Sequence, residues 1–226
     1  MIKLTRRDVV TLAGGAAFLA AMGLPAFAEG EAAATTDAPA ADAPATADAA
    51  PVEVPDLVLG NPDAKVTLTE YASYTCPHCA NFHDAVFKPL KAEYIDTGKV
   101  KFVFREVYFD RYGLWASLVA RCGGDMRYFG LSSILFEKQR EWAASEDPMV
   151  VVENLKTIGR TAGLSNEQLD ACMQDEKMVE AMIAKFQKDM EADEVQGTPT
   201  LFLNGTKHSN MAYADLKALI DAELAK

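Results

Sequence analysis

The sequence has few cysteines, few histidines and too little positive charge for several classes of protein. Its 226 residues include 4 Cys, 3 His and 22 Lys or Arg against 33 Asp or Glu, which gives a formal net charge of −11. Such an acidic chain is not expected to bind nucleic acid or an anionic membrane surface. Only Cys76 and Cys79 lie close together, whereas a zinc ribbon needs a second close pair, so we expect no metal site. No internal repeat and no His-rich or Met-rich segment is present.

The N-terminal segment also lacks the long unbroken apolar run of a transmembrane helix. Basic residues precede a short apolar stretch from 9 to 24 that threonine and glycines interrupt, and Ala26-Phe27-Ala28 has a small-x-small cleavage pattern. Residues 1–28 are therefore predicted to be a signal peptide that is cleaved after about Ala28. Arg6-Arg7 leaves both the Sec and the twin-arginine export routes open, and retention as an anchor is the alternative.

Residues 29–53 contain almost only Ala, Pro, Thr, Asp and Glu and no basic residue. Such a segment cannot bury enough apolar surface to order itself, so it is predicted to be a disordered linker. It is either a spacer from the envelope surface or a passive remnant of the leader. The folded part then spans 54–226, which is the length of one domain with a sizeable core.

The most informative motif is Cys76-Pro77-His78-Cys79, which lies between a predicted strand and a predicted helix. Val66–Tyr71 alternates apolar and polar residues as a strand does, and an apolar stripe at helical spacing begins at Cys79. A proline suits the first position of a helix, where its missing N–H costs no hydrogen bond. The pattern predicts that Cys76 lies at the N-terminus of a helix.

A cysteine in that place is expected to be reactive. The thiolate is the form that attacks a disulfide, and the free N–H groups of a helix N-terminus stabilise its charge. Cys76 is therefore the predicted nucleophile, and Cys79, three residues later on the same helical face, is the predicted buried, resolving thiol. The helix dipole contributes only about 0.3–1 kcal/mol, so hydrogen bonds to the sulfur must add to it. His78 is placed to provide one and is predicted to tune the pair.

The motif allows three other interpretations. Covalent haem attachment requires a histidine directly after the second cysteine, where this chain has Ala80. Structural zinc lacks its second ligand pair, since Cys122 and Cys172 stand alone. A purely structural disulfide across so short a loop would restrict the unfolded chain little. A redox-active dithiol is the interpretation that remains.

The rest of the chain predicts strand, helix, strand, a helical stretch, a hairpin and a last helix. Lys99–Arg105 alternates as a strand, and Asn204-Gly205 is a strong hairpin signal. Helical periodicity in the intervening stretch runs over 113–121, 126–142, 148–162, 165–172 and 175–193. This order predicts an α/β protein with a thioredoxin fold that is interrupted by a helical insertion over about 110–193.

Three segments of the chain resemble those of a known protein family. Glu70–Cys79, Phe102–Glu106 and Gly197–Gly205 together resemble the DsbA-type thiol:disulfide oxidoreductases of bacterial envelopes. The resemblance extends from about residue 54 to the C-terminus. A Cys-Pro-His-Cys tetrad combined with a downstream Thr-Pro is specific, although Cys-x-x-Cys alone would be weak.

The resemblance implies roles for the matched residues. It makes Cys76 the attacking sulfur, Cys79 the buried partner and Pro199 a cis-proline against the dithiol, with Thr198 in contact with the substrate peptide. It makes Glu70 a buried acid that assists proton transfer, while the alternation of the strand also allows a carboxylate that faces solvent. Many DsbA-type oxidases have valine where this chain has Thr198, and reductases and isomerases often have threonine.

The remaining cysteines and histidines have separate interpretations. Since Cys76 and Cys79 form the natural close pair, Cys122 and Cys172 are predicted to form a second, structural disulfide, and such a disulfide also resembles some alphaproteobacterial members of the family. His83 is interpreted either as a solvated surface residue or as a tuning group, and it is assigned no role. Aromatic residues of the insertion such as Trp115, Tyr128 and Phe129 could line a client groove, although core packing is the simpler use.

The predicted function is an exported periplasmic enzyme that donates the Cys76–Cys79 disulfide to newly translocated proteins through a mixed disulfide at Cys76. No tightly bound cofactor is needed, the resemblance implies reoxidation by a membrane quinone-linked partner, and a monomer is favoured. The alternatives are a reductase or isomerase of the envelope, a copper-handling thioredoxin-fold protein, since thiolates suit Cu(I), and a non-enzymatic holdase.

Overall fold

The structure is a computed structural model, and it describes residues 52–226. The predicted signal peptide and all but the last two residues of the predicted linker lie outside these described residues. None of the helices within 52–226 has the length and apolar character that crossing a bilayer requires.

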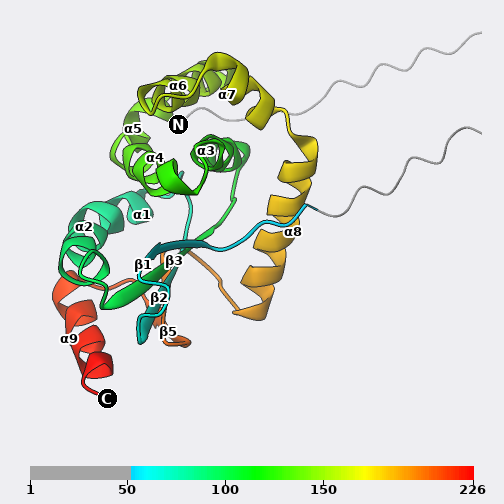
Figure 1. Cartoon of the computed structure of the whole chain (residues 1–226). Helices are drawn as coiled ribbons and strands as arrows, with labels where there is room; N and C mark the ends of the chain where they lie inside the picture. The colour runs from blue at the N-terminus through cyan, green and yellow to red at the C-terminus, as the bar shows by residue number, and fades with distance from the viewer. Residues whose placement is uncertain (1–51) are drawn as a thin grey trace, which may run out of the picture. The chain divides into compact units, whose positions relative to one another are not determined.

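The described residues alternate strands with helices, and most of the helices lie between the third and the fourth strand (Figure 1). The strands are β1 (Leu57–Gly60), β2 (Val66–Ala72), β3 (Val100–Glu106), β4 (Thr200–Leu203) and β5 (Thr206–Ser209). The helices before the third strand are α1 (Pro77–Phe82), α2 (Lys88–Leu90) and the π-helical η1 (His83–Phe87) and η2 (Lys91–Ile95). The later helices are α3 (Arg111–Cys122), α4 (Asp125–Glu137), α5 (Gln139–Trp142), α6 (Pro148–Thr161), α7 (Asn166–Met173), α8 (Glu176–Ala192) and α9 (Tyr213–Leu224).

The five strands form one mixed sheet in the order β1-β3-β2-β4-β5. β2 and β3 are parallel, and the other neighbouring pairs are antiparallel. The predicted strands and the Asn204-Gly205 hairpin are present, and both turn residues have the positive φ that this two-residue turn requires. The sequence did not reveal β1, because four residues after a proline are too short for a clear alternation. The predicted α/β class is confirmed.

The dithiol helix continues from Pro77 to Ile95 through two π-helical turns. Pro89 lies inside it, where a proline has no N–H for the helical ladder. A π-helical turn lies on each side of the short segment that contains Pro89, so the chain changes its hydrogen-bond spacing there and still continues as a helix. This long helix packs on the sheet and carries Cys76 and Cys79 at its start.

The helical stretch follows the predicted boundaries closely except at one point. Periodicity predicted a single helix over 126–142, but the chain leaves helical geometry at Lys138 (φ −99°, ψ 13°) and divides into α4 and α5. Apolar spacing continues across this break, which is why the sequence hid it. The Ser165 and Gln168 capping box is formed at the start of α7.

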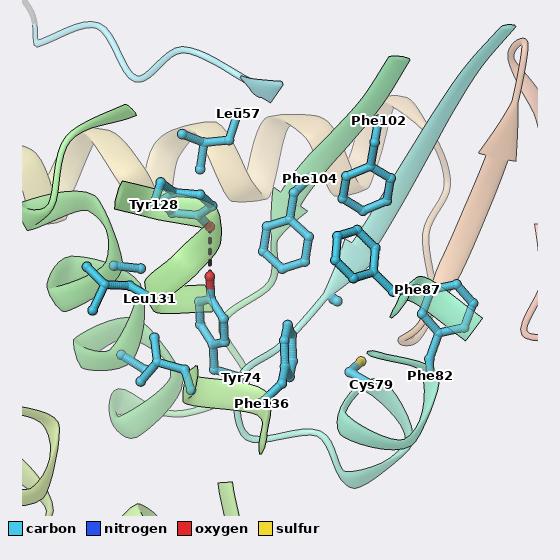
Figure 2. Packing of buried hydrophobic residues seen from close by; sticks show 14 of the residues in the cluster. Leu57, Tyr74, Cys79, Phe82, Phe87, Phe102, Phe104, Tyr128, Leu131 and Phe136 are labelled. Carbon is cyan, nitrogen blue, oxygen red and sulfur yellow. Dashed lines mark hydrogen bonds between the residues drawn. The ribbon is translucent and has the colours of Figure 1, made fainter. Parts of the chain in front are cut away.

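The two faces of the sheet bury different side chains. On one face, Leu68 and Ala72 of β2 join the main core together with Cys79. Figure 2 shows Cys79 in this core near Phe82 and a group of aromatic rings that includes Tyr74. On the other face, a small cluster forms around Tyr71, Val107 and Val195 with apolar residues of α8. Even-numbered residues of β2 therefore point toward the dithiol helix.

Candidate active site

Cys76 ends a tight turn and begins the dithiol helix. Its backbone N–H donates to the Ser73 carbonyl at 3.1 Å, and its own carbonyl accepts from the N–H groups of Cys79 and Ala80 at 3.1 and 3.2 Å. Cys76 has extended dihedral angles (φ −81°, ψ 118°) and is the N-cap residue, with Pro77 at the first helical position. The turn therefore places the Cys76 side chain beside the free N–H groups of the first helical turn.

The two thiols differ sharply in exposure. Both are free in the structure, but Cys76 is partly exposed whereas Cys79 is completely buried. Only the first sulfur can meet a protein substrate. The second can react with Cys76 and is shielded from other partners.

The surroundings of Cys76 favour its thiolate form. The pKa of Cys76 is lowered to about 5, first by a hydrogen bond from the Cys79 thiol and then, against the opposing effect of partial burial, by Thr198. The backbone N–H groups of Cys79 and His78 lower this pKa further. Cys76 is thus ionised near neutral pH, which is the state required of an attacking thiol.

His78 acts on the Cys76 sulfur through its backbone. Its side chain is exposed and makes no hydrogen bond with another residue in the part of the chain that the structure describes. Its backbone N–H, at the free end of the helix, is one of the groups that lower the pKa of Cys76, after the Cys79 thiol, Thr198 and the Cys79 N–H. The backbone at this position of the motif therefore adds to the stabilisation of the Cys76 thiolate.

Cys79 has the opposite chemistry. Its burial raises the pKa of its thiol strongly, and the hydrogen bond with Cys76 and the charge of Glu70 raise it further. Near neutral pH, Cys79 keeps its proton and Cys76 has lost its proton. The reduced pair therefore carries one proton and one negative charge.

Glu70 lies on β2, on the face that points toward the dithiol helix, and it is only 3% exposed. The alternative that its carboxylate faces solvent is therefore wrong. Burial raises the pKa of Glu70 to about 8, and the charge of Cys76 adds to this rise. The side chain is a buried acid that carries its proton near neutral pH.

The loop before β4 completes the site from the other side. The Thr198–Pro199 peptide bond is cis, and the Cys76 thiol donates to the Thr198 carbonyl with 3.6 Å between sulfur and oxygen. The Thr198 hydroxyl is buried without an oxygen or nitrogen partner in residues 52–226. It lowers the pKa of both thiols. The antiparallel pairing of β2 with β4 brings this loop to the dithiol.

The second pair of cysteines lies in the insertion, away from this site. Cys122 at the end of α3 and Cys172 in the last turn of α7 form a disulfide with a Cα–Cα distance of 5.8 Å and a sequence separation of 50 residues. This disulfide therefore cross-links α3 and α7.

Three residues near the dithiol were missed or misplaced by the sequence. Gln139 of α5 is buried and donates to the carbonyl of Cys76, and Asp110, the N-cap of α3, accepts from the Thr75 hydroxyl at 2.6 Å. His83 is only 5% exposed and stacks between two phenylalanine rings, so the surface interpretation was wrong. A polar residue at one position of an apolar stripe was the available signal for His83. Nothing local marked Gln139.

A buried polar network supports the turn from behind. Tyr74 and Tyr128 share a hydrogen bond of 2.8 Å, which Figure 2 shows as a dashed line, and Tyr128 donates to Glu106 at 2.8 Å. Arg121 pairs with the same carboxylate at 2.8 Å. Tyr128 is therefore a core residue that is not available to line a client groove.

Comparison with known proteins agrees with this geometry. Residues 53–222 match the family model described as Thioredoxin. The chain belongs to the thioredoxin family. Crystal structures of two proteins resemble it closely: alpha-DsbA1 of Wolbachia pipientis (26% identity, TM-score 0.71, 77% of this chain and 94% of that one) and BdbD of Bacillus subtilis (27%, 0.67, 76% and 94%).

Curated relatives with similar sequences have names that refer to disulfide chemistry. The "Putative protein-disulfide oxidoreductase" of Rickettsia bellii is 39% identical over 167 residues, which is 74% of this chain and 63% of the relative. The disulfide bond formation protein D of Bacillus subtilis is 29% identical over 181 residues, 74% of this chain and 76% of the relative. This chain therefore spans less than two thirds of the Rickettsia protein. The resemblance to DsbA-type proteins and the thioredoxin fold are confirmed.

Proposed function

We propose that this protein is a thiol:disulfide oxidoreductase that donates the Cys76–Cys79 disulfide to cysteines of other proteins. The observation that carries the proposal is the asymmetry of the pair: a partly exposed thiol with a pKa of about 5 lies next to a fully buried thiol with a raised pKa. The names of the relatives and neighbours support the same chemistry.

The proposed reaction moves two electrons from the client to the enzyme. A client thiolate attacks the Cys76 sulfur of the oxidised pair, a client–Cys76 bond forms, and the Cys76–Cys79 bond breaks. Cys79 leaves as a thiolate and takes up a proton, for which Glu70 is the nearby donor with a pKa of about 8. The second client thiolate then attacks the client sulfur, and Cys76 leaves as the stable thiolate. A quinone-linked membrane oxidase is the proposed acceptor that restores the disulfide.

Stabilisation of the Cys76 thiolate favours the reduced enzyme and therefore makes its disulfide oxidising. Thioredoxin has a thiol pKa of about 7 and a potential of about −270 mV. A pKa of about 5 raises the potential by about 30 mV for each unit of pKa. We therefore expect a value between about −210 mV and the −120 mV of strong oxidants.

We also propose that the protein is exported to the periplasm and donates its disulfide there to newly translocated proteins. The N-terminal pattern before Ala28 and the redox chemistry support both points, since a disulfide donor works in an oxidising compartment. We propose that the protein acts there as a monomer.

Trapping tests the mechanism. A Cys79→Ala variant is offered a single-cysteine client peptide as its disulfide-linked dimer: the Cys76 thiolate attacks this disulfide, one peptide leaves as a thiolate, and the other should stay on Cys76 as one added peptide mass, while Cys76→Ala should retain none. Oxidation of a reduced client should be lost in both variants. A measured potential near −270 mV would contradict the donor role, and trapping at a cysteine other than Cys76 would contradict the mechanism.

A reductase or isomerase is the second candidate, and Thr198 is the observation that keeps it. Its side chain lowers the pKa of both thiols, at a position where many DsbA-type oxidases have a valine. The potential measurement decides between the two directions of electron flow.

A further inference from the structure

Gln139 links the helical insertion to the turn that carries the nucleophile. It is the first residue of α5 and is only 6% exposed. Its Nε2 atom donates to the Tyr74 carbonyl at 2.7 Å and to the Cys76 carbonyl at 2.9 Å. Both hydrogens of the side-chain amide are therefore used on two carbonyls of the same turn, one on each side of Thr75.

These two carbonyls depend on Gln139 to different degrees. Within the described residues, no other donor reaches the Tyr74 carbonyl, because the turn lies between β2 and α1 and has no strand partner there. The Cys76 carbonyl also accepts from the first turn of the helix. Without Gln139, a buried carbonyl would lose its only partner, and the turn would have to move to reach water.

Gln139 is itself held firmly in place. Three residues later, Trp142 is buried, and its Nε1 atom donates to the Leu135 carbonyl of α4 at 2.7 Å. This hydrogen bond links α5 to α4 across the break at Lys138, where the chain leaves helical geometry. Gln139 directly follows this break, and its side chain reaches the carbonyls of the catalytic turn.

The position of the turn affects the Cys76 thiolate directly. The N–H groups of His78 and Cys79 lower the pKa of Cys76, and they act only if the Cys76 backbone directs its sulfur over the helix end. The oxygen of the Cys76 carbonyl also carries partial negative charge near that sulfur. An amide N–H on this oxygen offsets part of that charge.

We propose that Gln139 is a positioning residue that sets the acidity of Cys76, and hence the redox equilibrium of the dithiol, by holding the carbonyls of Tyr74 and Cys76. The insertion thus contributes to the redox chemistry as well as covering the site. The inference rests on the proposed function, because it concerns the same dithiol.

The test is a Gln139→Met variant, which keeps the length of the side chain but removes both donors. We expect the pKa of Cys76, followed by the ultraviolet absorbance of its thiolate, to rise by about one unit. The equilibrium constant with glutathione should shift about tenfold toward the oxidised enzyme, which is a potential about 30 mV more negative. Gln139→Glu should shift both further, since its carboxylate faces the two carbonyls and adds negative charge near Cys76.

The matched control is Gln187→Met on α8, the same chemical change at an exposed helical position. It should leave the Cys76 pKa within about 0.3 unit and the glutathione equilibrium constant within twofold of the wild type. The proposal is overturned if Gln139→Met has a native circular dichroism spectrum and an unchanged Cys76 pKa, or if Gln187→Met has an equal effect. It is also overturned if both Gln139 variants fail to fold, because a purely structural role would then account for Gln139. Failure of the wild-type dithiol to exchange with glutathione would instead contradict the proposed function. The comparison of the Cys76 pKa between variants would still test the role of Gln139.

Discussion

The chain contains two pairs of cysteines whose surroundings differ in almost every respect. Cys76 is the N-cap of a helix, beside free N–H groups that stabilise a thiolate. Cys122 and Cys172 lie in the last turns of α3 and α7, where the helix dipole disfavours negative charge. The first pair is found as thiols and the second as a disulfide.

This difference shows how a fold gives one functional group two uses. A disulfide is easily reduced when one of the thiolates it releases is stabilised, and it is hard to reduce when neither is. The helix ends therefore favour exchange at Cys76 and a lasting bond between Cys122 and Cys172. The loop lengths act in the same direction, because a bond across two intervening residues restricts the unfolded chain far less than one across a separation of 50.

The largest expected effect comes from removing the bond in the insertion. A double variant, Cys122→Ala with Cys172→Ala, should lose about 4 kcal/mol of unfolding free energy by the chain-entropy relation. The same relation gives about 2 kcal/mol for the Cys76–Cys79 bond. Urea unfolding of the variant and of the wild type, both with the dithiol reduced, measures the first value.

The redox properties of the same double variant sharpen the comparison. If the two pairs are independent, the Cys76 pKa should stay within about 0.3 unit, and the glutathione equilibrium constant within twofold, of the wild type. A loss of less than 1 kcal/mol, or a shift of the dithiol equilibrium by more than tenfold, would break the division between a reactive and a structural pair.

The sequence predicts the first pair better than its surroundings because the relevant signals are local. The signals for the pair lie within about ten residues of one another: a strand, a cysteine, and a proline at the first helical position. The signal for the hairpin at Asn204-Gly205 is equally local. The side to which Glu70 points was not readable, because a shift of one residue in strand register reverses every side chain. The structure resolves it through the packing of Leu68 and Ala72.

The contribution of the insertion was hidden for a related reason. The break at Lys138 leaves the apolar spacing intact, and the buried partners of Gln139 lie more than 60 residues earlier in the chain. His83 looked equally suited to the surface, since one polar residue in a helical stripe does not reveal which rings will cover it. Contacts between distant segments require the tertiary fold, which periodicity alone does not supply.

The second expected effect is the pH dependence of the dithiol potential. Above the Cys76 pKa of about 5, the reduced pair carries one proton, so the potential should fall by about 30 mV per pH unit. Below that pKa the reduced pair carries two protons, and the slope should double. A redox titration from about pH 4 to pH 7 should show this break near pH 5.

The same shift has a defined sign for stability. The folded pKa of Cys76 lies below its unfolded value, so the thiolate stabilises the reduced protein above the unfolded pKa of about 8.5, and this stabilisation is lost as the pH falls through about 5. The oxidised protein has no such contribution. Thr198→Val provides the matched comparison, because loss of the hydroxyl should move the break to higher pH. A single slope over the whole range would mean that Cys76 is not ionised in the reduced enzyme.

The smallest expected effect concerns Glu70, the buried acid beside the reactive pair. Its pKa of about 8 means that it is neutral at the pH where Cys76 titrates. Glu70→Gln should therefore leave the Cys76 pKa within a few tenths of a unit of the wild type. The rate of client oxidation should fall about tenfold, below the 100-fold or more of a fully committed general acid, because water can also bring a proton to Cys79.

Stopped-flow measurement of exchange with a reduced peptide, together with the thiolate absorbance, separates the two roles that Glu70 could have. A slower reaction with an unchanged Cys76 pKa is the result expected of a proton donor to Cys79. A fall of the Cys76 pKa by a full unit would instead mean that Glu70 is already ionised near pH 5 and acts through its charge. Burial on the sheet face beneath the dithiol would then fail to hold the proton, and the asymmetry between the two thiols would need another source.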